Sequence, residues 1–196
     1  MKYNTYVALK IQKSSQNYLE AAYDEVEILD TVASNWEKGE WQRSIREYYG
    51  DQPQKLKKME GPEGCHCVQL LNSFLHSGPN GKHFVMVFEI MGVNLLEVIK
   101  AFEYKGVPIP ITRQIAKQCL IGLDYLHRMC NLIHTDLKPE NVLVSLRLDE
   151  LEEIKRKGCL KDPKHKPSHV MDGTTNFADL ALGETFKRCK NLKPSQ

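Results

Sequence analysis

The sequence lacks any long hydrophobic run. No apolar stretch in its 196 residues approaches the roughly 20 residues that a membrane-spanning helix requires. Behind the polar start Met1–Thr5 there is also no apolar segment of the kind that marks a secretory signal peptide. We therefore expect a soluble intracellular protein, cytoplasmic, nuclear or both, that has no membrane partner.

An excess of one charge is also missing. The 27 Lys and Arg residues nearly balance 25 Asp and Glu, which gives a net charge of +2. A dedicated nucleic-acid-binding protein normally carries a clear basic excess, so no direct nucleic-acid partner is expected. With 41% hydrophobic and 27% charged residues the chain is not a disordered tail, and its length suffices for one good core or two small lobes.

Six cysteines are spread over the chain, at positions 65, 67, 119, 130, 159 and 189. In the absence of a secretion signal they are interpreted as free thiols in a reducing compartment. A zinc site is the alternative, built from Cys65-His66-Cys67 or from Cys159, His165, His169 and Cys189. Structural thiols are favoured, because these spacings match no standard zinc module and Cys-x-Cys crowds a tetrahedral site.

Signals of a small sheet and one helix fill the first part of the chain. Residues 6–11 have the apolar and β-branched pattern of a strand, and possible caps at 14–17 precede a helix that extends to about Val32. Two further apolar runs, 68–74 and 83–88, flank the turn Gly78–Gly81 and predict a hairpin. Between helix and hairpin, residues 34–64 are interpreted as an inserted connection with room for one short helix, anchored locally by Trp36 and Trp41.

The second part of the chain is predicted to be mainly helical. A short helix starts at Leu95, and Thr112 is expected to cap a longer one. Its apolar face would comprise Ile115, Cys119, Leu123 and Leu126. Two short strands should enclose a polar loop within 132–144. In 147–157 acidic residues precede basic ones, an order that suits a helix dipole, and a Lys/Pro/His-rich spacer follows.

The most specific motif lies in the polar loop. It reads His134-x-Asp136-x-Lys138-x-x-Asn141, the arrangement that phosphoryl transfer uses. In such a loop the aspartate accepts and orients the proton of the substrate hydroxyl, and the asparagine coordinates Mg²⁺. The alternative is a polar loop that only turns the chain, which eight matching residues in order make improbable.

A second motif pairs a strand lysine with a helix carboxylate. Lys10 ends Val7-Ala8-Leu9-Lys10, and Glu25 lies on the helix that follows. A lysine in this position holds the α- and β-phosphates of a nucleotide if a carboxylate orients it. Alone it would be interpreted as a solvated residue, but upstream of the loop motif the functional interpretation is favoured.

These residues resemble eukaryotic protein kinases, and more narrowly the SR-protein kinases, which phosphorylate serine/arginine-rich splicing factors. The similarity covers residues 6–145 apart from the insertion at 34–64. The matching stretches are Tyr6–Lys10, Val68–Leu71 with Ser77–Gly81, Phe84–Glu89 with Gly92–Leu96, and Gly122–His127 leading into His134–Asn141.

The resemblance implies an α+β fold, a partial two-lobed kinase. Residues 1–92 would form a partial small lobe and 93–146 the start of the large lobe with its catalytic loop. A spacer insert at 147–173 and a truncated metal-binding segment at 174–196 would follow.

The resemblance also implies ATP and Mg²⁺ as cofactors and assigns roles to individual residues. Asp136 would be the base and Lys138 would neutralise charge on the γ-phosphate. Adenine would be held by backbone groups of Glu89 and Met91, with Phe88 behind the pocket. The remaining roles would belong to Lys10 with Glu25, which anchor the phosphates, and to Asn141 and Asp179, which hold Mg²⁺.

Three departures from the family pattern affect these expectations. Thr135 stands where many kinases carry the arginine that pairs with a phosphorylated activation loop, so no such phosphate switch is expected. SR-protein kinases share this threonine and are regarded as constitutively active. Asp179 precedes Leu180-Ala181 instead of Leu-Gly, and a chance aspartate is the alternative there.

The last departure is length. Nine residues precede Lys10, 17 follow Asp179, and no Ala-Pro-Glu motif occurs. The expected protein is thus a serine/threonine kinase truncated at both ends, which as a 196-residue chain would not turn over. A non-catalytic fragment or pseudokinase that acts as a binding module is the alternative.

Overall fold

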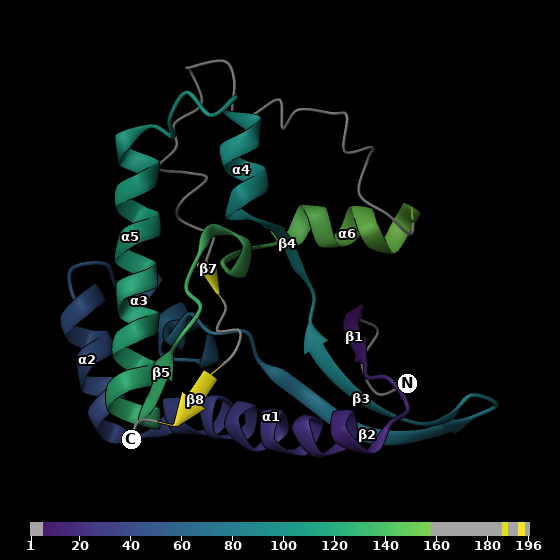
Figure 1. The fold of residues 1–196 in the computed structure, drawn as a ribbon. Coiled ribbons are helices and arrows are strands. Elements are labelled where there is room, and N and C mark those ends of the chain that lie inside the picture. Colours follow the sequence, from purple (N-terminus) through teal and green to yellow (C-terminus); the bar gives the residue numbers. More distant parts are fainter. Residues whose placement is uncertain (1–5, 158–185, 188–191, 195–196) are drawn as a thin grey trace.

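A computed structural model describes residues 6–157, 186–187 and 192–194 of the chain (Figure 1). The helices are α1 (Gln16–Ser34), α2 (Gly39–Tyr49), α3 (Pro53–Met59), α4 (Leu95–Ala101), α5 (Ile109–Asp124) and α6 (Leu148–Lys157). The strands are β1 (Val7–Ile11), β2 (Leu70–Gly78), β3 (Gly81–Glu89), β4 (Met91–Asn94), β5 (Leu132–His134), β6 (Leu143–Ser145), β7 (Phe186–Lys187) and β8 (Leu192–Pro194). The predicted α+β class is confirmed.

An antiparallel sheet in the order β1-β3-β2 lies on α1 (Figure 1). Its hairpin closes where Gly78 pairs with Gly81, as the turn signal predicted. Gly81 has φ +108°, a conformation that a residue with a Cβ atom rarely adopts. The sheet core joins Ala22 and Leu29 of α1 to Phe84 and Met86 of β3, so the apolar stripe of the helix faces the sheet.

The insertion is more ordered than the sequence indicated. Residues 34–64 form two α-helices, α2 and α3, with short 3₁₀ turns before α2 and after α3. Helix α2 lies beside α5, where Lys117 Nζ donates to the Tyr48 carbonyl at 3.3 Å (Figure 1). Trp41 is no local anchor, because its fully buried ring meets Tyr125 edge-on at a centroid distance of 4.8 Å. One face of α2 is buried, although polar residues between its members hid the apolar pattern in the sequence. This face is formed by Trp41, Ser44, Ile45 and Tyr49.

Helix α5 starts earlier and is rotated relative to the prediction. It begins at Ile109 after Pro108, and the Thr112 hydroxyl donates to the carbonyls of Val107 and Pro108 instead of capping the helix. Its buried residues are Gln118, Ile121 and Gly122. Of the predicted face, Leu126 is fully buried, whereas Ile115, Cys119 and Leu123 are only half-buried because the inserted helices cover a neighbouring stripe.

A π-helical turn, η3 (Tyr125–Met129), continues α5. The wider turn keeps Tyr125, Leu126 and Met129 in the interior. Together with α2, α3 and β5 they form a second core, here termed the helical core. Its members are Val32, Trp41, Ile45, Tyr49, Met59, Cys65, Cys67, Ile121, Tyr125, Leu126, Met129, Cys130 and Leu132.

Short strands frame the polar loop as predicted. β5 precedes it and pairs with β8, whereas β6 follows it and pairs with β4 and β7. The predicted helix at 147–157 is confirmed by α6, which has Asp149 and Glu150 in its first turn. Most of the predicted spacer and the segment around Asp179 lie outside the described residues. None of the helices in the described part is both long and apolar enough to cross a membrane.

Candidate functional site

The loop between β5 and β6 brings its three polar motif residues together. Lys138 Nζ lies 2.9 Å from Asp136 Oδ1. Asn141 Nδ2 donates to the Asp136 carbonyl at 2.8 Å and to its carboxylate at 2.9 Å. A 3₁₀ turn, Pro139–Asn141, folds the buried asparagine back over the aspartate. The residues of the motif therefore form one group of contacts.

The electrostatics of this group suit a reaction at an anionic phosphate. The hydrogen bond from Lys138 to Asp136 raises the pKa of the lysine, so its charge is kept at neutral pH. The Asn141 amide nitrogen donates to Asp136, and the Oδ1 atom of the asparagine is a carbonyl oxygen of the kind that ligates a hard cation. The amide of Asp136 donates to Nδ1 of the buried His134 at 3.3 Å, which fixes the start of the loop.

The second motif is also assembled. Lys10 Nζ lies 2.5 Å from both carboxylate oxygens of Glu25. Strand β1 carries the lysine opposite Met86 of β3, and α1 presents the glutamate beneath the sheet. The side chains are 38% and 35% exposed, so this ion pair is accessible to a ligand.

The end of β3 and the start of β4 hold the residues expected around adenine. Phe88 is half-buried and packs against the sheet core, where it pairs with Ala8 of β1. The Glu89 carboxylate accepts a hydrogen bond from the backbone N–H of Gln69 at 3.0 Å, which ties the end of β3 to the start of β2. Met91 begins β4, opposite Ser145. The adenine-binding roles of Phe88, Glu89 and Met91 stay predictions.

Two further sequence predictions concern Asp179 and Thr135. Asp179 lies outside the described residues, and its role as a metal ligand stays a prediction. Thr135 is exposed beside Asp136, and the inference about a phosphate switch likewise stays a prediction.

The zinc alternative gains no support from the described part. It contains no group of three or more His, Cys, Asp or Glu residues that could hold a metal ion. Cys65, Cys67 and Cys130 are buried in the helical core, and none of the three forms a disulfide. The second set of possible zinc ligands begins at Cys159 and lies outside the described residues.

One polar cluster was missed by the sequence analysis. Arg128 of η3 contacts Asp124 and two residues of the insertion, Glu40 and Ser44. Asp124 and Arg128 are four residues apart on consecutive helical turns, a spacing that indicates an ion pair. Nothing in the local sequence indicated that α2 would supply the other partners.

Comparison with known proteins identifies the family of this chain. The protein kinase domain family matches residues 41–156. The chain is 49% identical over 148 residues to "Serine/threonine-protein kinase SRPK" of Physarum polycephalum, covering 74% of this chain and 29% of that protein.

Two further relatives extend the likeness to other organisms. The chain is 43% identical over 162 residues to "Protein kinase dsk1" of Schizosaccharomyces pombe, covering 83% of this chain and 26% of that protein. It is 38% identical over 139 residues to "SRSF protein kinase 3" of Mus musculus, covering 71% of this chain and 21% of that protein. The chain thus spans between a fifth and a third of each relative, and the resemblance to SR-protein kinases is confirmed.

Proposed function

Since the chain belongs to the protein kinase family, we propose that it is the central part of a kinase that transfers the γ-phosphate of ATP to serine in Arg/Ser-rich proteins. One observation carries the proposal: Asp136, Lys138 and Asn141 form a single hydrogen-bonded group on a loop held between two strands. Such a group positions a hydroxyl, a phosphate and a cation side by side, which is what phosphoryl transfer requires.

Asp136 is the proposed acceptor of the serine hydroxyl proton. Its carboxylate is oriented from two sides, by Lys138 Nζ and by Asn141 Nδ2, so it need not reorganise during the reaction. Positioning of this kind supplies most of the catalysis in phosphoryl transfer. Lys138 is half exposed and carries its charge on the same side, where it can neutralise the transferred phosphate.

Lys10 is proposed to hold the α- and β-phosphates of ATP. Glu25 contacts the lysine with both oxygens and thereby fixes the direction of its ammonium group. Asn141 fits a divalent cation through its carbonyl oxygen, a hard ligand of the type that Mg²⁺ prefers. Bound Mg²⁺ would supply charge neutralisation between the phosphates. Asp179 is the proposed second ligand.

The substrate class rests on the resemblance to SR-protein kinases and on the relative named SRSF protein kinase 3. Splicing factors rich in Arg-Ser dipeptides are the proposed partners, and residence in the cytoplasm, the nucleus or both is proposed with them. No observation on the described residues favours a second function.

The test is radiolabelled phosphate transfer from ATP to an Arg-Ser repeat peptide. The transcript is first sequenced across both ends of the chain, and its complete product is assayed beside the 196-residue chain. Asp136→Asn in each form serves as the blank, and a peptide with alanine for serine is the substrate control. We expect serine-dependent incorporation by the complete product and none by the short chain. Incorporation by the complete product no higher than the blank contradicts the proposal and favours a pseudokinase that binds partners.

A further inference from the structure

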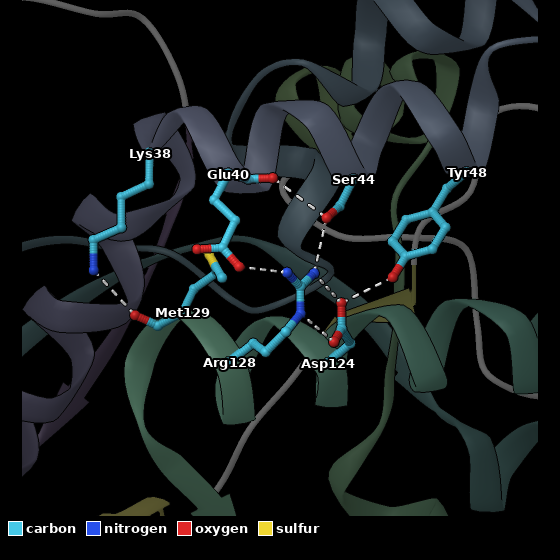
Figure 2. Close-up of polar contacts among 7 residues, drawn as sticks. All are labelled: Lys38, Glu40, Ser44, Tyr48, Asp124, Arg128 and Met129. Atoms are coloured by element: carbon cyan, nitrogen blue, oxygen red, sulfur yellow. Dashed lines mark hydrogen bonds and ion pairs between the residues drawn. The ribbon is translucent and has the colours of Figure 1, made fainter.

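The inserted helices α2 and α3 have no part in the proposed chemistry, yet α2 is tied to the end of α5 by a group of charged contacts. Figure 2 shows Arg128 at the centre of this set, between α2 and the end of α5. We name the group the Arg128 clamp. It comprises Glu40, Ser44, Tyr48, Asp124 and Arg128.

The guanidinium group of Arg128 joins two segments that are distant in sequence. On its own helix it forms a two-pronged contact with Asp124, with Nε 2.8 Å from Oδ1 and Nη2 2.7 Å from Oδ2. Toward α2, Nη1 lies 2.9 Å from Glu40 Oε1 and Nη2 lies 2.8 Å from Ser44 Oγ. Such forked contacts specify orientation, which a lysine cannot do with its single ammonium group.

The clamp is closed from the other side by Tyr48. Its hydroxyl donates to Asp124 Oδ2 at 2.9 Å (Figure 2). Beneath this polar layer the Trp41 ring packs on Tyr125. Helix α2 is therefore attached to the end of α5 by both charge and apolar contact, and it cannot slide along α5 without breaking both.

Residues just before α2, which follow the end of α1, are also attached to the turn that contains Arg128. Asn35 Nδ2 and Lys38 Nζ donate to the Met129 carbonyl at 2.9 and 3.1 Å. The Tyr125 hydroxyl donates to the carbonyl of Val32, in the last turn of α1, at 2.6 Å. Val32 belongs to the helical core, whereas Ala22 and Leu29 belong to the sheet core, so α1 bridges both cores.

We propose that the α2–α3 insertion is a strut that fixes the C-terminal end of α1 to α5 and thereby holds Glu25 against Lys10. Arg128 and Glu40 are then positioning residues for the proposed kinase reaction, and the inference rests on that function. Glu25 lies nine residues before Ser34, which is about 14 Å along a helix. A tilt of roughly 10° about the anchored end would shift Glu25 by about 2 Å, enough to break its hydrogen bonds to Lys10.

Amide hydrogen exchange on the 196-residue chain tests the strut directly. Arg128→Ala should speed exchange at residues 25–34 by about fivefold or more while β2 and β3 stay unchanged, because only the anchor of α1 is lost. Arg128→Lys should give an intermediate rate, since one contact to Asp124 is kept. Arg46→Ala is the matched control, because Arg46 also lies on α2 but pairs with Glu60 within the insertion.

Tyr48→Phe covers the case in which Arg128→Ala does not fold. It deletes one hydroxyl of the clamp and should also speed exchange selectively at 25–34, by less. Unchanged exchange in α1, or an equal rise in α1 and in the sheet, would overturn the strut. These measurements need no nucleotide, so a failed phosphate-transfer assay contradicts the proposed function without touching this result. If transfer is found, Arg128→Ala should raise KM for ATP more than KM for the peptide.

Discussion

Lys10 and Glu25 form a close ion pair on a surface that is still open to solvent. About a third of each side chain is exposed, and pairs in such positions contribute on the order of 0–1 kcal/mol to folding. Their short contact is therefore of little use for stability. It serves to aim the ammonium group, and a substitution at Lys10 should separate catalysis from folding.

Lys10→Met is predicted to cut phosphate transfer by at least about a hundredfold, because charge on the transferring phosphates is no longer stabilised. Its free energy of unfolding should change by less than about 1 kcal/mol. Turnover and urea unfolding are measured on whichever form of the protein passes the Asp136→Asn blank. Lys13→Met is the control, since Lys13 follows β1 closely and its ammonium group lies over the Tyr18 ring, 5.9 Å from its centroid. Unchanged turnover in Lys10→Met contradicts the assignment.

Asp124 makes the clamp sensitive to acid. The hydrogen bond from Arg128 holds the pKa of this carboxyl below its ordinary value. A lowered folded-state pKa means that the stabilisation is fully present above the unfolded-state pKa, about 3.9. It is lost as the pH falls through the lower folded-state value.

Asp124→Asn should therefore lower the melting temperature by about 2–4 °C at pH 5 to 7, the effect of about 1 kcal/mol in a chain of this size. The difference from the wild type should shrink steadily as the pH is lowered from 5 to 3. Thermal unfolding followed by circular dichroism across this range measures it. A difference that is the same at pH 3 and pH 7 would show that Asp124 acts through packing and not through its charge.

At the scale of elements, the insertion is held by its buried aromatic residue. Trp41 is fully buried and lies against Tyr125, a residue 84 positions further along the chain. Burial raises the pKa of Tyr125, whose hydroxyl stays protonated and donates to α1. Loss of the indole ring would open a cavity beside this tyrosine, at the point where α1, α2 and α5 meet.

Trp41→Ala is predicted to lower the free energy of unfolding by about 3–5 kcal/mol, the usual cost of deleting a buried aromatic side chain. Trp36→Ala should cost less than half of this, because Trp36 is only half-buried at the margin of the same core. Urea unfolding is followed by far-ultraviolet circular dichroism, since either substitution removes a fluorescent indole. Equal losses in the two variants would show that Trp41 is not the main anchor of the insertion.

At the scale of the whole molecule, the sheet has an open side. Strand β1 pairs with β3 on one edge, and within the described residues nothing pairs with its other edge. Leu9 and Ile11 on this strand are 57% and 61% exposed. An apolar edge strand with unpaired backbone groups is a template for association between chains.

Ile11→Lys is predicted to reduce self-association of the 196-residue chain, because a charge on an edge strand opposes pairing with another edge. Light scattering over a concentration series compares it with the wild type. Tyr104→Lys is the control, since Tyr104 is an exposed apolar residue in the loop after α4, far from the sheet in sequence. Equal improvement by both substitutions would indicate a general effect of charge and not an effect of the strand edge.

The sequence by itself determined the features that depend on neighbouring residues. The hairpin at Gly78–Gly81, the loop from His134 to Asn141 and the helix at 147–157 each follow from local turn chemistry, alternation or charge order. The site residues Lys10, Glu25, Asp136, Lys138 and Asn141 were identified from two short motifs, and the structure brings them together in two groups. Short motifs suffice here because each group lies on one loop or on two consecutive elements.

Only the tertiary structure decided where the insertion goes. Glu40, Ser44 and Tyr48 look like solvated polar residues in the sequence. In the structure Asp124 at the end of α5 and Arg128 of η3 bind them, and Trp41 packs on Tyr125 of η3. The buried face of α5 and the turn after it was predicted only in part for the same reason, since the stripe that a helix buries depends on the partner that covers it. Periodicity shows that a helix has an apolar face, whereas contacts between distant segments determine which residues that face buries.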